Sequence, residues 1–278
     1  MARDFAGGSS DRIDCGTFAV VSSEFTMCCW VRADSFNSSR DDRFISKADG
    51  AGTANHDWML GKTDDSGPKL RARANRVSVT TFGSTTLPTA AWFHALLTYS
   101  NGVVTLYLNG SADGSDTHGS GNLPNNSNAV YIGNQPTSTS NAPDGRIAEV
   151  GIWSRVLTDN EIASLARGTP PSRFPDSLEL YQPLGHGSPE PDYSGKLRNG
   201  TVTGAVVADH PPMMSAFGFD SYGVFASAVG GSTPVNISAG ATVTLALSRE
   251  VWRIASVTAP LSTTFYMEIG RASCRERV

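Results

Sequence analysis

The pattern in this sequence that is best suited to ligand binding is a run of alternating basic and apolar residues. In Lys69–Ala74, the basic residues Lys69, Arg71 and Arg73 alternate with apolar ones. Successive side chains of a β-strand point to opposite faces, so we expect the three cations to share one face. That face suits an anionic or hydroxyl-rich polysaccharide. The alternative is an ordinary solvated sheet face.

Two residues earlier in the chain, one with an indole ring and one with an imidazole, extend the predicted site. His56 and Trp58 lie near a predicted loop-to-strand transition. Sugar-binding proteins place an aromatic ring against the C–H face of the sugar and polar groups against its hydroxyls. We therefore predict that Lys69, Arg71, Arg73, His56 and Trp58 bind ligand. The alternative for Trp58 is the apolar core, since tryptophan is highly buried on average.

The carboxylates lack the spacing that glycoside hydrolysis needs on a single strand. Retaining hydrolysis uses two carboxyl groups about 5 to 5.5 Å apart, and residues i and i+2 of a strand share a face. Before residue 155 the only glutamates are Glu24 and Glu149, and neither has an acidic residue two positions away. Gly-x-Ser-x-Gly and glycine-rich phosphate-binding motifs are absent. We predict no catalytic residues, although this test does not cover a carboxylate pair formed across two strands.

The cysteines indicate neither a disulfide framework nor a zinc site. Cys15, Cys28 and Cys29 form an odd set with two adjacent members, and Cys274 lies in the C-terminal tail. No Cys-x-x-Cys spacing is present. We expect three free, buried thiols, because unpaired cysteine packs as a small hydrophobe.

Short alternating or apolar runs separated by Gly, Asn, Asp and Ser fill residues 3–155, which is typical of an all-β sandwich or barrel. Asn101-Gly102 predicts a tight hairpin because Asn-Gly readily adopts the positive φ angles of that turn. Asn109-Gly110 ends the next run, and the polar stretch Ser111–Asn128 is expected to be a long loop. The predicted strands are Arg12–Cys15, Phe25–Arg32, Arg43–Lys47, Asp57–Lys62, Lys69–Ala74, Ser78–Phe82, Trp92–Tyr99, Val103–Leu108, Ala129–Ile132, Arg146–Trp153, Leu178–Leu184 and Thr201–Ala208.

One helix is predicted, capped by Thr158. Thr158 and Glu161 fit a capping box, in which each side chain binds the backbone N–H of the other residue. Leu157 and Ile162 fit the hydrophobic staple that accompanies it, and Gly168 ends the helix. At about ten residues the helix is too short to be stable alone, so we expect it to dock on the sheets.

We divide the chain into four parts. Residues 1–172 form the main β domain, and residues 173–212 form a closing strand and linker packed on it. Residues 213–267 contain further alternating runs and are predicted to be a small, truncated β module of unknown role. Residues 268–278 are expected to be an artefact, because Ile269–Val278 resembles the translation of a sequencing adapter.

Six motifs in residues 3–168 occur in the order found in one family of β-sandwich domains. The motifs are Asp4–Asp14, Phe25–Val31, Phe44–Lys47, Trp92–Ala95, Leu106–Gly110 and Gly145–Trp153. Together they resemble the LamG-like jelly roll of the concanavalin A-like lectin/glucanase superfamily. The resemblance implies an all-β, two-sheet antiparallel jelly-roll sandwich with one short docked helix, followed here by the small β module.

The resemblance also raises calcium as a cofactor. Calcium takes several oxygen ligands from carboxylates and carbonyls, and Asp113, Asp116 and Glu149 are the candidates. Where the family usually has Asp before the Glu of the last motif, this sequence has Ala148, which removes one carboxylate. The alternative for the two aspartates is that they are solvated turn residues.

The resemblance favours non-catalytic carbohydrate binding to a glycan or polysaccharide, in an extracellular, cell-surface or virion location. The formal net charge of −4 argues against nucleic acid, whose binders carry a basic footprint. No apolar run approaches the ~20 residues that span a bilayer, and the start of the chain lacks the apolar core of a signal peptide, so membrane insertion is not expected. Two alternatives stay open: a passive structural module contacting other chains of an assembly, and a glycoside hydrolase.

Overall fold

The computed structural model describes residues 1–36, 41–49, 55–63, 67–135 and 141–213. The chain divides into two compact units, Met1–Gly218 and Phe219–Val278, and every described residue belongs to the first. The β module predicted at 213–267 therefore lies outside the described residues, apart from Met213. In the described ranges, no helix has the length and apolarity needed to cross a membrane.

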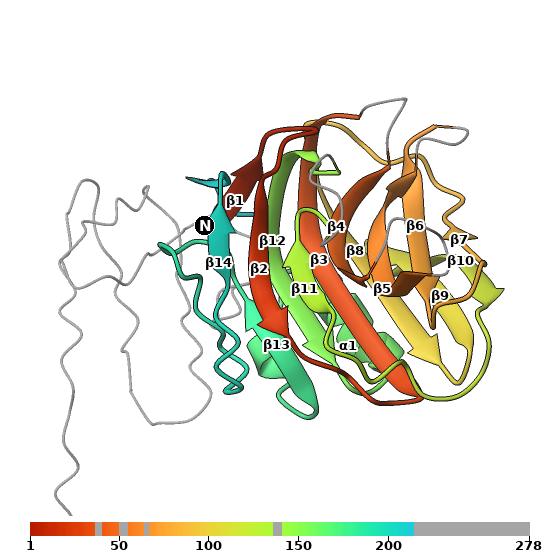
Figure 1. The fold of residues 1–278 in the computed structure, drawn as a ribbon. Coiled ribbons are helices and arrows are strands. Elements are labelled where there is room, and N and C mark those ends of the chain that lie inside the picture. Colours follow the sequence, from red (N-terminus) through yellow and green to blue (C-terminus); the bar gives the residue numbers. More distant parts are fainter. Residues whose placement is uncertain (37–40, 50–54, 64–66, 136–140, 214–278) are drawn as a thin grey trace, which may run out of the picture. The chain divides into compact units, whose positions relative to one another are not determined.

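The first unit is a sandwich of two antiparallel sheets (Figure 1). In the described part of the chain the larger sheet has 8 strands: β1 (Ala2–Phe5), β3 (Glu24–Ser35), β8 (Trp92–Ser100), β9 (Val103–Leu108), β10 (Ser111–Thr117), β12 (Asp144–Trp153), β13 (Leu178–Gln182) and β15 (Val206–Ala208). Their order is β10-β9-β8-β3-β12-β1-β15, and β13 pairs with β12 beside this path.

The smaller sheet has 7 strands within the same described ranges: β2 (Arg12–Thr17), β4 (Asp42–Ala48), β5 (His56–Thr63), β6 (Lys69–Ala74), β7 (Thr81–Phe82), β11 (Ala129–Ile132) and β14 (Thr201–Thr203). Their order is β14-β2-β11-β4-β5-β6-β7. Strands that neighbour each other in space are often distant in the chain, because the chain crosses repeatedly from one sheet to the other. This arrangement confirms the predicted jelly-roll sandwich.

The core lies between the two sheets and is built from the inward-facing residues of both. Phe25 of β3 and Trp58 of β5 lie 5.3 Å apart between ring centroids, and Phe44 of β4 and Phe93 of β8 lie 6.2 Å apart. These aromatic pairs span the sandwich, and all four side chains are at most 1% exposed. Burying a side chain of this size contributes about 1.5–3 kcal/mol to the free energy of unfolding, so such pairs hold the two sheets together.

The Asn-Gly turns adopt the predicted geometry. Asn101 has φ 42° and Gly102 has φ 100°, and the turn joins β8 to its antiparallel neighbour β9. Asn109 and Gly110 have φ 51° and 84° and join β9 to β10. The second turn shows that the chain continues into a paired strand where the sequence predicted a long loop.

Two features of the strand prediction were wrong for identifiable reasons. Ser111–Thr117 forms β10, an edge strand whose polar, partly charged residues lack the apolar alternation of a buried strand. Thr201–Ala208 is not one strand, because Gly204 at φ 76° breaks it. Its halves β14 and β15 pair with β2 and β1, which belong to different sheets.

The helix α1 (Asp159–Ala166) covers one end of the outer face of the larger sheet. The predicted capping box is confirmed: Thr158 Oγ1 accepts the N–H of Glu161, whose carboxylate accepts the N–H of Thr158. Leu157 and Ile162 are both buried in a cluster with Leu96 of the sheet. A short 3₁₀ helix, Pro171–Arg173, follows α1 and leads into β13.

The segment after the helix completes both sheets. β13 pairs with β12, β14 with β2, and β15 with β1. Arg3 of β1 joins this segment by donating from Nε to Glu190 Oε1 at 2.6 Å and from Nη1 to Ala205 O at 3.1 Å. Residues 173–208 are therefore integral to the sandwich.

Candidate functional site

The basic residues of β6 lie on the outer face of the smaller sheet. The three apolar residues of this strand belong to the core between the sheets, so the alternating side chains of Arg71 and Arg73 point away from it. Both arginines are nevertheless largely covered, with 6% and 5% of their surface exposed. Lys69, at the start of the strand opposite Thr63, is partly buried.

Arg71 lies in a row of residues that crosses three strands, between Gly61 of β5 and Phe82 of β7. Its Nη1 pairs with the Asp41 carboxylate, while its Nε is enclosed without a hydrogen-bond partner in the described structure. Burial, and then the charge of Arg73, lowers the pKa of Arg71 to about 10. The guanidinium is therefore poorly solvated and still has an unused donor.

Arg73 is less engaged with the protein than Arg71. Its Nε donates to Thr80 Oγ1 at 3.1 Å. Within the described ranges its terminal nitrogens Nη1 and Nη2 have no protein acceptor, and they are not among the enclosed atoms. Burial lowers the pKa of Arg73 as well. Its planar fork of N–H donors is thus available to a ligand.

Phe82 provides aromatic surface beside these cations. The side chain is 42% exposed, and its ring centroid lies 6.0 Å from Arg71 Cζ. Residues directly opposite each other in an antiparallel pair share a face, so Phe82 and Arg71 both lie on the outer face. The sequence predicted a strand ending at Phe82 but gave no signal for its pairing with β6.

Arg43 and His56 belong to a polar network next to these residues. Arg43 Nε donates to Gln135 Oε1 at 3.1 Å, and His56 Nε2 lies 3.4 Å from the same oxygen. Asp41, which contacts Arg71, also lies 3.8 Å from Arg43 Nη1. The binding residues predicted from the sequence did not include Arg43 or Gln135. A bulge directly after Arg43 breaks the strand alternation that could have assigned its face.

Trp58 makes no contribution to this surface. Its side chain is 1% exposed and packs against Phe25 in the core. This burial corrects the prediction that Trp58 contacts ligand, because a ligand cannot reach a ring between the two sheets. The exposed aromatic ring of the site is Phe82.

The three candidate calcium ligands lie far apart. Asp113 and Asp116 are on β10 and Glu149 is on β12, with β9, β8 and β3 between them. At about 4.8 Å per strand the separation is ~19 Å, so the three cannot bind one ion. Asp113 Oδ1 instead accepts from Ser84 Oγ and Thr85 N, both at 3.0 Å. No three His, Cys, Asp or Glu side chains form a metal-binding group in the described part of the chain.

Glu149 anchors the end of the sandwich. It lies in a bulge of β12 with φ 53° and is 4% exposed. Its Oε2 accepts from the Tyr181 hydroxyl at 2.8 Å, and its Oε1 lies 2.9 Å from His210 Nε2. These contacts tie the segment that follows β15 to the larger sheet.

A lysine ammonium occupies an oxygen-rich position at one end of the smaller sheet. Lys47 Nζ donates to Asn128 O at 2.6 Å and Asn126 O at 3.3 Å, and lies 3.6 Å from Asp57 Oδ2. Asp57 also accepts from the side-chain amides of both asparagines and from Arg76. Carbonyl and carboxylate oxygens are typical calcium ligands, but here the ammonium supplies the positive charge.

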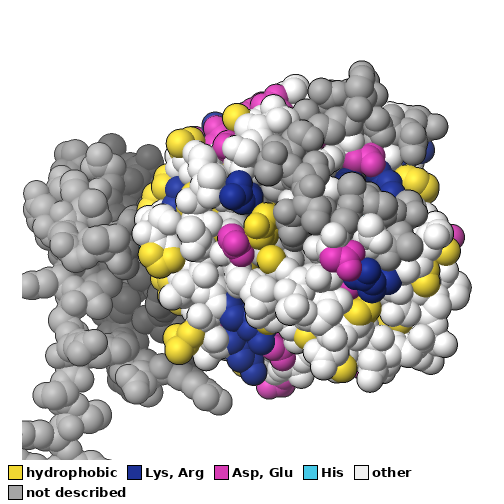
Figure 2. Space-filling view, in the orientation of Figure 1, with side chains coloured by type: hydrophobic (Ala, Val, Ile, Leu, Met, Phe, Trp, Pro, Cys, Tyr) yellow, Lys and Arg dark blue, Asp and Glu magenta, His cyan; other side chains and the backbone are white. Residues whose placement is uncertain are grey.

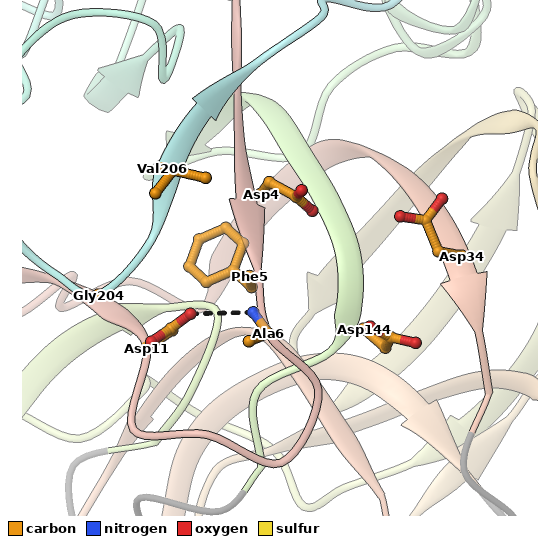
Figure 3. Close-up of a pocket in the computed structure, with 8 residues that line it drawn as sticks. All are labelled: Asp4, Phe5, Ala6, Asp11, Asp34, Asp144, Gly204 and Val206. Carbon is orange, nitrogen blue, oxygen red and sulfur yellow. Dashed lines mark hydrogen bonds between the residues drawn. The ribbon is translucent and has the colours of Figure 1, made fainter.

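A pocket of about 380 Å³ lies beside β1 and β15 (Figure 3). It is lined by Asp4, Phe5, Ala6, Asp11, Asp34, Asp144, Gly204 and Val206. Burial is the largest cause that raises the pKa of Asp4, and Asp34 and Asp144 raise it further, while Arg146 lowers it. This cross-strand group of carboxylates left no signal in the sequence, because its members come from four separate segments.

The pocket carboxylates are engaged mainly with the protein itself. Asp11 accepts the N–H of Ala6 at 2.9 Å, the contact drawn in Figure 3. Asp34 pairs with Arg32, and Asp144 accepts from the Ser35 hydroxyl. Asp11, Asp34 and Asp144 therefore each have a hydrogen-bond or ion-pair partner within the protein.

The three described cysteines are poor nucleophiles. Cys15, Cys28 and Cys29 are free and at most 3% exposed, as the sequence predicted. Burial raises the pKa of each thiol, so the reactive thiolate is disfavoured.

The strand order and the core between the sheets are those of a jelly-roll sandwich. The family model described as the concanavalin A-like lectin/glucanases superfamily matches residues 7–163. The chain belongs to that superfamily, which confirms the resemblance found in its motifs. No curated protein matches the sequence.

Several solved structures share the fold. A "putative carbohydrate binding protein" from Bacteroides ovatus is 22% identical, with a TM-score of 0.59, over 75% of this chain and 59% of its own. A heptameric SAP-like pentraxin from Limulus polyphemus is 16% identical, with a TM-score of 0.49, over 59% and 81%. Domain 4 of AbnA, a GH43 extracellular arabinanase from Geobacillus stearothermophilus in complex with arabinotriose, is 20% identical, with a TM-score of 0.42, over 55% and 69%. The chain thus spans 59% of the length of the Bacteroides protein.

Proposed function

We propose that the protein binds carbohydrate without hydrolysing it, on the outer face of the smaller sheet over β6 and β7. The observation that carries the proposal is the exposed Phe82 ring beside the Arg71 guanidinium, with Arg73 on the same face of β6 and its terminal nitrogens unbonded within the described ranges. Membership of a lectin-type superfamily and the fold shared with the Bacteroides ovatus protein support the same function.

The contact combines the two chemistries that sugar recognition needs. The apolar C–H face of a sugar ring packs on Phe82. The guanidinium donors of Arg71 and Arg73 bind the oxygen substituents around that ring. Neither arginine serves as a general acid or base, since a guanidinium keeps its proton in proteins, so the expected outcome is binding without turnover.

The proposal includes the setting in which such a module acts. Glycans are presented outside cells, so we place the protein in an extracellular, cell-surface or virion-associated assembly. Detection of the chain on intact cells or particles by antibody labelling checks this location. Labelling found only after cells are permeabilised would contradict it.

A glycan array with the purified full chain, followed by calorimetry on the strongest ligand, tests the function. The Phe82→Ala variant should bind about two- to twelvefold more weakly, because stacking on an aromatic ring contributes about 0.5–1.5 kcal/mol. Val103→Ala is the matched control, since Val103 is 43% exposed against 42% for Phe82 but lies on β9 of the other sheet. Equal affinities of the two variants would remove β7 from the binding surface, and an array without any saturable binding would refute carbohydrate recognition.

A further inference from the structure

Among the described residues, fewer carboxylates than guanidinium groups contact Arg71, Arg73 and their neighbour Arg43. The two residues point from the same face of β6, two positions or about 6.6 Å apart. Asp41 pairs with Arg71 but also faces Arg43, so it is shared between two guanidiniums. In the described part of the chain, Arg73 contacts no carboxylate.

The unused donors of the pair are also partly desolvated. Arg71 Nε is enclosed without an acceptor, in a side chain that is 6% exposed. Leaving a buried charged donor without a partner is unfavourable. A ligand cannot reach the enclosed Nε, so it binds the pair through terminal guanidinium nitrogens that are not enclosed. Arg73 presents both terminal nitrogens, which match the two oxygens of a carboxylate in a bidentate pair.

The overall charge of the protein does not favour the approach of an anion. Its formal net charge is −4. Figure 2 shows basic and acidic side chains next to one another on the visible face rather than a broad field of one sign. A preference for an anion must therefore come from local contacts such as those of this pair.

We propose that the saccharide bound at β6 and β7 is acidic, and that its carboxylate binds Arg73 and Arg71 while its ring packs on Phe82. This inference rests on the proposed carbohydrate-binding function and specifies its ligand. A carboxylate is the favoured anion because Arg71 already binds one, that of Asp41, at the same face. Both uronic acids and sialic acids carry this group.

The test compares matched acidic and neutral oligosaccharides by calorimetry on the full chain. An oligogalacturonate and its fully methyl-esterified form share the same rings but differ in charge, and sialyllactose and lactose form the second pair. We expect one acidic member to bind at least about tenfold more tightly than its neutral partner. Arg73→Gln should weaken acidic binding by about tenfold or more, the size expected for a lost hydrogen bond between charged groups, and should weaken neutral binding less, because a neutral sugar loses only hydrogen bonds to its hydroxyls.

Arg12→Gln is the control variant, because Arg12 is an arginine on β2 of the same sheet, ~19 Å from β6 by strand spacing. Arg73→Lys keeps the charge without the fork and should lose part of the affinity. Circular dichroism and thermal melting verify that each variant folds. Equal binding of acidic and neutral members would overturn the acidic ligand but keep carbohydrate recognition. An absence of binding by all four probes and by the array would overturn both.

Discussion

The buried carboxylate of Asp57 gives the sharpest test of what holds one end of the sandwich together. Asp57 is 0% exposed and accepts hydrogen bonds from Arg76 at 3.1 Å, Asn126 at 2.9 Å and Asn128 at 3.0 Å, with Lys47 Nζ 3.6 Å away. Asp57→Ala removes the acceptor common to all four groups. The ammonium of Lys47 would then be buried without a counter-charge.

Removing one partner of a buried ion pair destabilises a protein by about 3–5 kcal/mol. For a domain of this size, each kcal/mol lowers the melting temperature by about 2–4 °C, so we expect a decrease of about 6–20 °C. Asp49→Ala is the matched control. Asp49 also binds Arg76, at 2.6 Å, but its side chain is 45% exposed. An exposed pair contributes about 0.2–1 kcal/mol, which corresponds to at most about 4 °C.

Urea denaturation and differential scanning calorimetry of the wild type and the two variants measure both quantities. The reasoning would be refuted if Asp57→Ala were no less stable than Asp49→Ala, because the two carboxylates share one arginine but only Asp57 is buried and contacts Lys47 and the two asparagines. An unchanged m-value is required for the comparison, since a change in m would mean that the compactness of one state had altered.

Two further predictions concern acid and calcium. Burial lowers the pKa of His94 to about 3 from an ordinary value of 6.5. The unfolded chain therefore takes up this proton first, so stability is lost as the pH falls from 6.5 toward 3. Between pH 7 and 5 the wild type should lose about 2 kcal/mol more than His94→Phe in urea denaturation, and equal losses would contradict this. Sugar binding should not need calcium, because the proposed contacts are made by side chains and the ammonium of Lys47 supplies the positive charge among the oxygens around it. The affinities measured in calcium and in EDTA should therefore agree. A loss of affinity in EDTA would show that a metal ion is required.

Local chemistry made much of the fold predictable. The Asn-Gly turns need only two residues with positive φ, and the capping box of Thr158 and Glu161 needs only a spacing of three. Alternation in β6 correctly separated the arginines from the apolar residues. Each of these signals is contained in a few consecutive residues, so the sequence displays it directly.

The features of the fold and of the site that could not be predicted from the sequence depend on which strands become neighbours. Phe82 enters the site because β7 pairs with β6 in one particular register. Trp58 has the same β-strand alternation as its neighbours, but only the packing of β5 over β3 shows that its face is the core. Asp113 and Glu149 are both carboxylates on strands, and the sheet order alone reveals how far apart they lie. Long-range pairing is therefore the missing information.

The pairing of β1 with β15 also fixes where the polypeptide enters and leaves the sandwich. Ala2 lies opposite Ala208 in adjacent antiparallel strands, so the start of the first strand and the end of the last strand lie at neighbouring points. Such a unit can be inserted into a surface loop of a host protein without forcing the host's flanking segments apart. Tension applied between Ala2 and the segment after β15 would first load the contact of His210 with Glu149. It would then open the β1–β15 pair one hydrogen bond at a time, starting at Ala2, before it loaded the aromatic pairs between the sheets.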